Sequence, residues 1–293
     1  MLHGGRCTMT DRVVRCLATV SMGGTLRDRL EATATTGFQA VELFEQDVLD
    51  SHETLRSVRG MAADLGLRVE DYGPLRDVEG LADDTAHDSL ARAERMLDEA
   101  ADVGAGTVLV CSNTSPSAID DAGRSAEQLS RLADCAAQRG LRLAFEALAW
   151  GTHVRTYGEA WNIVRRAAHR SLGLVLDTFH TSALNDDPAP IEQIPGDRIF
   201  LVQVADAPLA TCDLVSWSRH LRCFPGEGAF PVVAMLRHVM NTGYRGPLSL
   251  EIFSDKVRQT AALPSARLAM QSLLSVERAL FSDVASRGSI ASA

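Results

Sequence analysis

Short apolar runs alternate with longer amphipathic segments along most of the chain. The apolar runs are rich in valine, leucine and phenylalanine, which is typical of strands buried on both faces of a sheet. The predicted strands cover residues 13–20, 38–47, 67–72, 107–113, 142–146, 174–177, 200–206 and 247–251. Helices are predicted to begin after the cap residue Thr25, and over residues 52–65, 85–103, 121–139, 157–168 and 263–281.

Strands that alternate with helices in this way indicate a parallel sheet. Eight such units in 293 residues favour a closed barrel, because a (β/α)8 barrel typically needs about 250 residues. An open dinucleotide-binding sheet would need a Gly-x-Gly-x-x-Gly motif after the first strand, and the pair Gly23 and Gly24 is far weaker than that. We therefore expect the α/β class with a single (β/α)8 TIM barrel over residues 13–283. An N-terminal extension (1–12) precedes it, and a Ser/Ala-rich, frayed tail (284–293) follows.

Four of the predicted strands carry an oxygen-bearing side chain at or near their carboxyl ends: Glu146, Asp177, Gln203 and Glu251. In a (β/α)8 barrel these ends meet at one mouth, where active sites lie. Three carboxylates there would repel one another, so either they raise one another's pKa or a cation lies between them. An all-oxygen set suits Mg²⁺ or Mn²⁺, with Co²⁺ as a substitute. We therefore predict one bound divalent metal ion.

Each of these acidic residues, taken alone, could equally form an ordinary ion pair or cap a helix. The metal interpretation rests on all four following apolar runs, since an unpaired buried charge is costly. Gln203 fits the interpretation as a neutral oxygen donor, whereas a core glutamine must find partners for both of its amide groups.

Two histidines lie beside these predicted ligands. His180 follows Asp177 by three residues, and His153 follows Glu146 by seven. Either imidazole could serve as a general base near neutral pH, and His180 is the first choice. The remaining histidines are expected to be ordinary surface or core residues.

Arginines in the predicted loops at the mouth are candidates for binding an anionic substrate. Arg76 follows the third predicted strand, while Arg219 and Arg222 follow the seventh. A guanidinium group binds a carboxylate or phosphate through paired hydrogen bonds. Arg222 is preferred to Arg219, and Arg76 could alternatively pair with the acidic residues beside it.

The net charge of −9 and the absence of a basic stripe argue against nucleic acid as a partner. No apolar run approaches the roughly 20 residues of a membrane span. The start of the chain lacks the apolar core of a signal peptide. The six scattered cysteines form no Cys-x-x-Cys pair, which is typical of reduced cytosolic thiols. We expect a cytoplasmic protein without a membrane partner, and the oligomeric state, including a homodimer, stays open.

These motifs resemble those of a known family. The predicted ligands, residues 177–180 and the Pro-Gly-Glu-Gly turn at 225–228 resemble the xylose-isomerase-like sugar phosphate isomerase/epimerase barrels. A narrower resemblance, to the bacterial 3-dehydroshikimate dehydratases, is carried by residues 21–26, 41–47, 76–80, 146–153 and 222–226.

The resemblance implies dehydration of 3-dehydroshikimate, a carboxylate-bearing small molecule, to protocatechuate. It implies that Arg222 holds the ring carboxylate with help from Ser218 or Arg76. The metal acts as a Lewis acid on the ring ketone, and His180 or His153 takes the proton beside it. No organic cofactor is expected, since the substrate carbonyl accepts the electron pair.

Other functions remain open at this point. A sugar or cyclitol isomerase, epimerase or dehydratase on the same barrel would use a carboxylate pair, Glu146 and Glu251, and would need no clamp for a substrate carboxylate. An endonuclease acting at abasic sites would need more histidine ligands and a basic face. A non-catalytic binding barrel would be expected to lose at least one of the four ligands.

Overall fold

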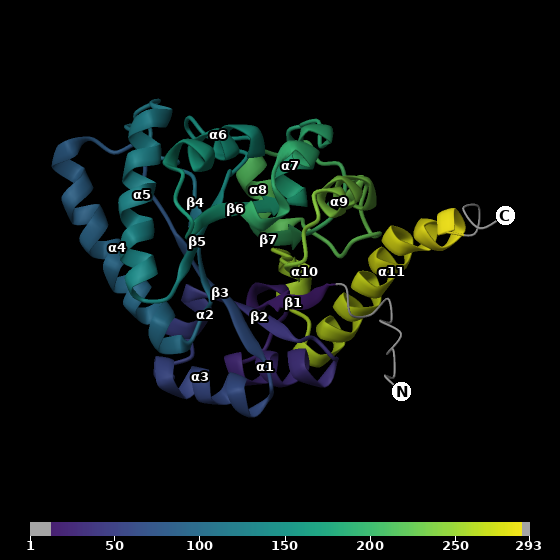
Figure 1. Cartoon of the computed structure of the whole chain (residues 1–293). Helices are drawn as coiled ribbons and strands as arrows, with labels where there is room; N and C mark the ends of the chain where they lie inside the picture. Colours follow the sequence, from purple (N-terminus) through teal and green to yellow (C-terminus); the bar gives the residue numbers. More distant parts are fainter. Residues whose placement is uncertain (1–12, 289–293) are drawn as a thin grey trace, which may run out of the picture.

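The computed structural model describes residues 13–288, with side chains as far as residue 282. Within this range the parallel strands pair in sequence order and β8 pairs with β1, so the sheet closes into a barrel (Figure 1). The predicted (β/α)8 barrel is confirmed. The strands are β1 (Val14–Ala18), β2 (Ala40–Phe44), β3 (Arg68–Leu75), β4 (Thr107–Cys111), β5 (Arg142–Glu146), β6 (Leu172–Asp177), β7 (Ile199–Val204) and β8 (Pro247–Leu250).

Helices cover the outside of the barrel and also form parts of its loops. They are α1 (Leu26–Thr35), α2 (Glu45–Asp50), α3 (Leu55–Asp64), α4 (Asp83–Val103), α5 (Ala122–Gln138), α6 (Tyr157–Ala167), α7 (Thr178–Ala183), α8 (Leu214–His220), α9 (Val232–Asn241), α10 (Asp255–Arg258) and α11 (Ala262–Gly288). Short 3₁₀ helices lie at Thr19–Ser21, Ala189–Gln193 and Gly196–Arg198.

The predicted helix start at Thr25 is confirmed, with a reciprocal cap. The Thr25 hydroxyl accepts a hydrogen bond from the Asp28 main-chain N–H (3.2 Å), and the Asp28 carboxylate accepts one from the Thr25 N–H (2.9 Å). Such a cap satisfies main-chain donors that the first turn of a helix leaves unpaired. It also places a negative charge at the positive end of the helix dipole.

The structure corrects several predicted element ends. β2 ends at Phe44 and α2 begins at Glu45, whereas the prediction carried the strand to residue 47. β3 continues to Leu75, through a cis bond between Gly73 and Pro74, instead of ending at Tyr72. The short helices in the loops, among them α7 and α8, were not predicted, because one or two turns carry too little periodicity to be distinguished from a loop.

The domain boundaries stay a prediction. The predicted extension, residues 1–12, lies outside the described residues. The predicted frayed tail begins at residue 284, yet α11 runs to Gly288, and residues 289–293 lie outside the described range.

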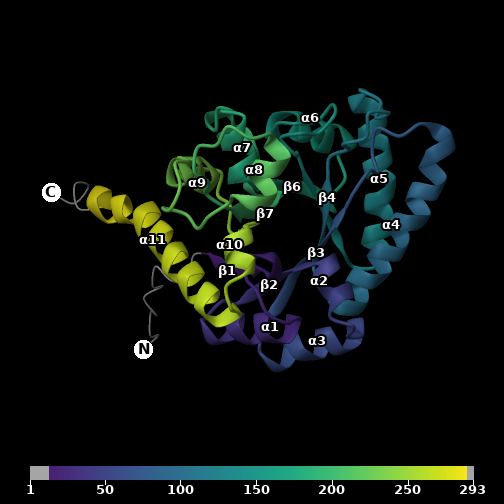
Figure 2. The same ribbon diagram turned by 180° about the vertical axis from the view of Figure 1, so that it is seen from behind.

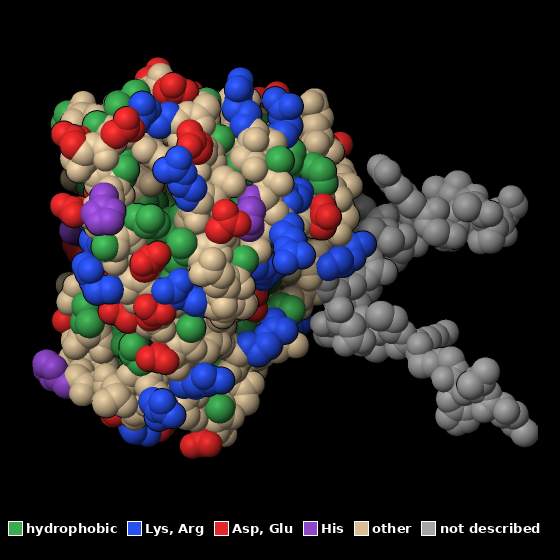
Figure 3. Space-filling view, turned by 60° about the vertical axis from the view of Figure 1, so that its left-hand side comes forward, with side chains coloured by type: hydrophobic (Ala, Val, Ile, Leu, Met, Phe, Trp, Pro, Cys, Tyr) green, Lys and Arg blue, Asp and Glu red, His purple; other side chains and the backbone are tan. Residues whose placement is uncertain are grey.

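Two views show how the helices surround the barrel. Figure 1 places α4 and α5 side by side on one flank and the long helix α11 on the opposite flank, and Figure 2 shows the same arrangement from behind. α11 packs against α1 and so closes the ring beside β1. On the face drawn in Figure 3, acidic and basic side chains are interspersed without a large region of one sign. Among the described helices, none combines the length and apolar character that a membrane crossing requires.

Candidate active site

The four predicted ligand residues meet at the carboxyl end of the barrel. Glu146 and Asp177 are the last residues of β5 and β6, Gln203 lies one residue before the end of β7, and Glu251 directly follows β8. Asp177 and Gln203 are register partners in neighbouring strands. All four side chains are buried. The closed parallel barrel therefore brings together residues that are up to 105 positions apart (from Glu146 to Glu251) in the sequence.

Two of these residues, together with His180, have the spacing of a metal site. One ligand atom each from Glu146, Asp177 and His180 lies within 4.8 Å of the others. Glu146 Oε1 and Gln203 Oε1 are buried and have no hydrogen-bond partner among the described residues. Oxygen atoms without partners in a buried, acidic centre fit a hard divalent cation, which would supply the missing positive charge.

The carboxyl groups at this centre have raised pKa values. Burial, followed by the charges of Asp177 and Glu251, raises the pKa of Glu146 well above its usual value. Burial raises the pKa of Glu251 to about 7, while Arg222 opposes the rise and Asp177 adds to it. Burial also raises the pKa of Asp177. Carboxylates that cannot all ionise freely are typical of sites that bind a metal or move a proton.

Arg222 lies among the carboxylates. Its Nη1 donates to Asp177 Oδ2 at 2.8 Å and to Glu251 Oε2 at 2.9 Å. Its Nη2 donates to the Ser218 hydroxyl at 2.9 Å. Arg222 is only 2% exposed, so these ion pairs are strong compared with surface pairs. Arg222 and Ser218 were predicted to contact the substrate; here Ser218 is fully buried and holds the guanidinium.

His180 is fixed by a neighbouring loop. Its Nδ1 accepts a hydrogen bond from the main-chain N–H of Ala149 at 3.1 Å, and the ring of Trp150 packs edge-on against it at 5.1 Å between centroids. Its Nε2 lies 3.5 Å from both Glu146 Oε1 and Asp177 Oδ2. Burial, with Arg222 and Arg219 nearby, lowers the pKa of His180 well below its usual value. A neutral imidazole whose Nδ1 accepts a hydrogen bond carries its hydrogen on Nε2.

The position of the ring hydrogen decides whether His180 can act as the predicted base. A base needs a lone pair, and in this tautomer the lone pair of His180 lies on Nδ1, against the Ala149 N–H. Nε2 also lies 3.4 Å from the Arg222 Nη2 donor, and it could bind a proton or a metal ion only in the other tautomer. The position of His180 therefore suits a hydrogen-bond donor to a substrate oxygen, and its role as base stays a prediction.

His153, the second predicted base, lies elsewhere. Its Nε2 is 2.9 Å from Glu79 Oε2, and it does not line the cavity beside Glu146 and His180. The Glu79 carboxylate also accepts hydrogen bonds from the Ser125 hydroxyl (2.5 Å) and the Asn113 main-chain N–H (2.9 Å). This arrangement joins the loops after β3, β4 and β5, which makes His153 a structural anchor in this conformation.

Three arginines also line the central cavity. Its lining includes Glu146, His180 and Glu251 together with Arg76, Arg219 and Arg222, and the apolar part of the lining comes from Phe44, Pro74, Leu109, Leu148, Trp150 and Phe253. Arg219 stacks over Phe253 with its guanidinium carbon 4.7 Å from the ring centroid. Within residues 13–288, neither Arg76 nor Arg219 forms an ion pair. Both guanidinium groups are thus available to an anionic ligand.

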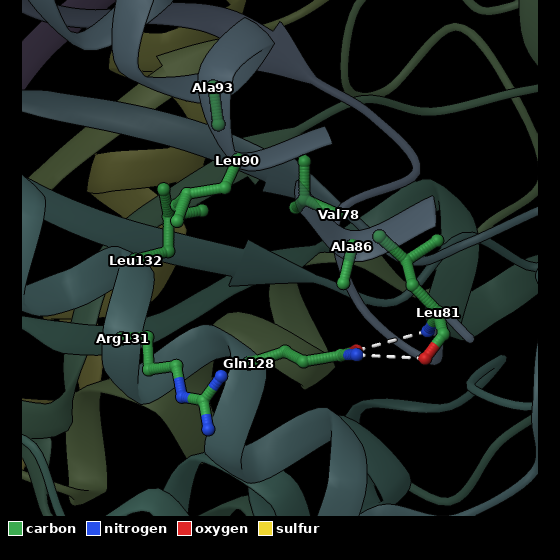
Figure 4. A pocket seen from close by; sticks show the side chains of 8 residues that line it. All are labelled: Val78, Leu81, Ala86, Leu90, Ala93, Gln128, Arg131 and Leu132. Atoms are coloured by element: carbon green, nitrogen blue, oxygen red, sulfur yellow. Dashed lines mark hydrogen bonds between the residues drawn. The ribbon is translucent and has the colours of Figure 1, made fainter. Parts of the chain in front are cut away.

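A second cavity, of about 50 Å³, lies between α4 and α5 (Figure 4). Its lining residues are Val78, Leu81, Ala86, Leu90, Ala93, Gln128, Arg131 and Leu132. Gln128 is hydrogen-bonded to both main-chain groups of Leu81, at 3.0 and 2.9 Å, so it ties the loop before α4 to α5. The lining is largely apolar and lacks acidic or nucleophilic groups, which indicates a packing defect rather than a site of chemistry.

Comparison with known proteins assigns the family. The family described as "Xylose isomerase-like TIM barrel" matches residues 30–276, which is most of the chain. The chain belongs to this family. The match includes the strand ends that carry Glu146, Asp177, Gln203 and Glu251.

Some relatives of this xylose isomerase-like barrel have curated names. A 3-dehydroshikimate dehydratase of Pseudomonas putida is 48% identical over 263 residues, which are 90% of this chain and 41% of that protein. A 3-dehydroshikimate dehydratase of Neurospora crassa is 26% identical, over 89% of each chain. The chain spans less than half the length of the Pseudomonas relative.

A solved structure is also similar to this xylose isomerase-like barrel. It is that of a "xylose isomerase-like TIM barrel/4-hydroxyphenylpyruvate dioxygenase fusion protein". It superposes with a TM-score of 0.91 and 45% identity, and the match covers 94% of this chain and 44% of that one.

Sequence reasoning missed two residues of this xylose isomerase-like site. Glu42, on β2, contacts Gln203, and Cys111, on β4, donates to Glu146 Oε2 at 3.3 Å. Glu42 follows the same pattern of an apolar run leading to a carboxylate, and this signal could have found it. Cys111 has no such signal, because an apolar strand ending in cysteine is common in protein cores.

Proposed function

We propose that this chain dehydrates 3-dehydroshikimate to protocatechuate with the help of one bound divalent metal ion. The observation that carries the proposal is the composition of a single cavity. Its lining combines the carboxyl groups of Glu146 and Glu251 with the guanidinium groups of Arg76, Arg219 and Arg222. A substrate with a ketone next to a hydroxyl and a carboxylate across the ring matches both kinds of group. The named relatives support the same reaction.

The metal would be held by Glu146, Asp177, Gln203 and Glu251. Bound there, a divalent cation supplies Lewis-acid chemistry, which makes the proton beside a carbonyl more acidic. Mg²⁺, Mn²⁺ and Co²⁺ all suit this set of oxygen donors.

The arginines bind and orient the substrate in this proposal. Arg76 and Arg219 offer unpaired guanidinium forks to the carboxylate, and Arg222 adds positive charge from beside the metal ligands. Trp150 and Phe253 form apolar walls that exclude water and strengthen these interactions. The alternative prediction is a sugar isomerase or epimerase, and a neutral sugar substrate carries no carboxylate that three arginines could bind.

The reaction moves protons and expels water without any net oxidation. A proton leaves the carbon beside the ketone, the hydroxyl on the next carbon departs as water, and a further proton shift to the carbonyl oxygen completes the aromatic ring. We propose that Glu146 takes the first proton through the carboxylate oxygen that does not hold the ion, because its side chain lines the cavity. His180 donates its Nε2 hydrogen bond to the oxygen that gains negative charge. No organic redox cofactor is required, because no electrons enter or leave.

The test is an ultraviolet assay for protocatechuate, made with EDTA-treated protein before and after addition of Mg²⁺, Mn²⁺ or Co²⁺. Product that depends on added metal supports both the reaction and the cofactor. Absence of product with every metal, from folded protein that binds one, contradicts the dehydratase assignment, and keto sugars and inososes would be tested next.

Two further predictions remain part of this proposal. Cytoplasmic location is supported by the described cysteines, since Cys16, Cys111, Cys135, Cys212 and Cys223 are all free thiols. The small-molecule partner carries a carboxylate, as the lining arginines require.

A further inference from the structure

The carboxamide of Gln203 has a defined orientation. Its Nε2 donates to Glu42 Oε1 at 2.9 Å and to Glu251 Oε1 at 3.1 Å. A flipped amide would place its oxygen against two carboxylate oxygens, which offers no hydrogen bond and adds repulsion. With Nε2 held in this way, Gln203 Oε1 is left buried and without a partner among the described residues.

The position of Glu42 is unfavourable for an ionisable side chain. It lies inside the barrel with 4% of its surface exposed, and its Oε2 has no hydrogen-bond partner in the described part of the chain. It faces other acids rather than a base: burial, Glu251 and Asp71 all raise its pKa. A buried carboxyl group without a cationic partner lowers stability, so its presence at this position calls for a function.

We propose that Glu42 is a positioning residue for the metal site: it holds Gln203 Nε2 and thereby turns Oε1 toward the cation. This inference rests on the metal-dependent function proposed above, but it concerns binding of the ion and not the reaction. Residues that orient metal ligands in other proteins typically change metal affinity by about 10- to 100-fold when they are replaced.

The chain offers a matched control on the next strand. Asp71 is the register partner of Glu42, is 1% exposed, and has no hydrogen-bond partner for either carboxylate oxygen among the described residues. Glu42→Leu and Asp71→Val each remove one buried acid, together with its hydrogen-bond acceptors, from the barrel interior. Only the first of these acids accepts a hydrogen bond from Gln203.

The experiment measures Mn²⁺ binding by isothermal titration calorimetry on EDTA-treated protein, without substrate. We expect Glu42→Leu, which leaves no acceptor for Gln203 Nε2, to bind Mn²⁺ about 10- to 100-fold more weakly than the wild type. Asp71→Val is expected to stay within about threefold of it, because Asp71 acts on Glu146 and Glu251 only through its charge and makes no contact with Gln203. The exchange variant Glu42→Gln/Gln203→Glu should regain most of the affinity, since the amide at 42 then donates to a carboxylate at 203, which remains an oxygen ligand.

Three results would overturn the inference. These are wild-type affinity in Glu42→Leu, an equal loss in Asp71→Val, and no recovery in the exchange variant. Should Glu42→Leu fail to fold, as seen by circular dichroism, the exchange variant decides alone. Mn²⁺ binding by wild type that lacks dehydratase activity would reject the proposed reaction and leave this test valid.

Discussion

His153 Nε2 lies 2.9 Å from Glu79 Oε2, and the two side chains are 3% and 0% exposed. The pair connects the loop after β5, which carries Ala149 and Trp150 against His180, with the loop after β3, which carries Arg76. The nearby carboxylates of Asp120 and Glu159 add further negative charge around the imidazole. One buried contact therefore links the loop that carries Arg76 to the loop that packs against His180.

The stability of the protein should depend on pH through this pair. The hydrogen bond to Glu79 raises the pKa of His153 above its usual value. A histidine whose pKa is raised in the folded state stabilises the fold fully below its unfolded pKa of about 6.5, and this contribution is lost as the pH rises through the folded-state pKa. We expect the free energy of unfolding in urea to fall as the pH rises from about 6.5 through the folded-state pKa of His153, and to fall less in His153→Gln.

The control for this prediction is His87→Gln, which replaces an exposed histidine on α4. It should keep the pH dependence of the wild type. Equal pH dependence in His153→Gln and in the wild type would show that the pair does not link the two loops energetically.

Removal of Arg222 should destabilise the metal-free protein. The guanidinium is the positive charge that pairs with both Asp177 and Glu251, so Arg222→Ala leaves these buried carboxylates without it. We expect a loss of about 3 kcal/mol in the free energy of unfolding, measured with urea in the presence of EDTA. Added Mn²⁺ should recover part of the loss, because a cation that binds only the folded state stabilises it. A loss unaffected by Mn²⁺ would contradict the proposed metal position.

The unpaired arginines should act on substrate binding. For Arg76→Ala and Arg219→Ala we expect KM for 3-dehydroshikimate to rise about 10- to 100-fold, since each loses a charge-assisted hydrogen bond worth about 1.5–3 kcal/mol. Mn²⁺ affinity should change little, because neither residue is paired with a proposed ligand. Arg131→Ala, on the exposed surface of α5, serves as the control and should leave KM unchanged. An unchanged KM in both test variants would indicate that Arg222 and Ser218 bind the substrate carboxylate instead.

His180 can be tested as donor against base. Glutamine carries an N–H donor but cannot accept a proton at neutral pH, whereas alanine offers neither. If His180 donates a hydrogen bond, kcat should fall about 100-fold in His180→Ala and clearly less in His180→Gln. If it is the base, both variants should lose activity to the same extent. Protocatechuate formation at saturating substrate, with metal binding verified for each variant, decides between the two roles.

Local patterns along the chain were sufficient for the fold and for placing the proposed metal ligands at strand ends. Apolar runs that alternate with helical periodicity imply a barrel, and the carboxyl ends of parallel strands converge whatever the intervening loops do. Glu146, Asp177, Gln203 and Glu251 could therefore be assigned to one mouth before any distance was known. Such inferences work because secondary structure and strand direction depend on short stretches of sequence.

Only the tertiary structure decided what surrounds these ligands. The loops brought Arg222 between two carboxylates, placed His153 on Glu79, and turned Nδ1 of His180 toward Ala149. None of these contacts follows from spacing, because the path of a loop depends on packing and hydrogen bonds to distant segments. The same holds for Glu42 and Gln203, which are 161 residues apart and meet only because the barrel closes. The pairing of side chains across a closed sheet is thus a property of the assembled fold.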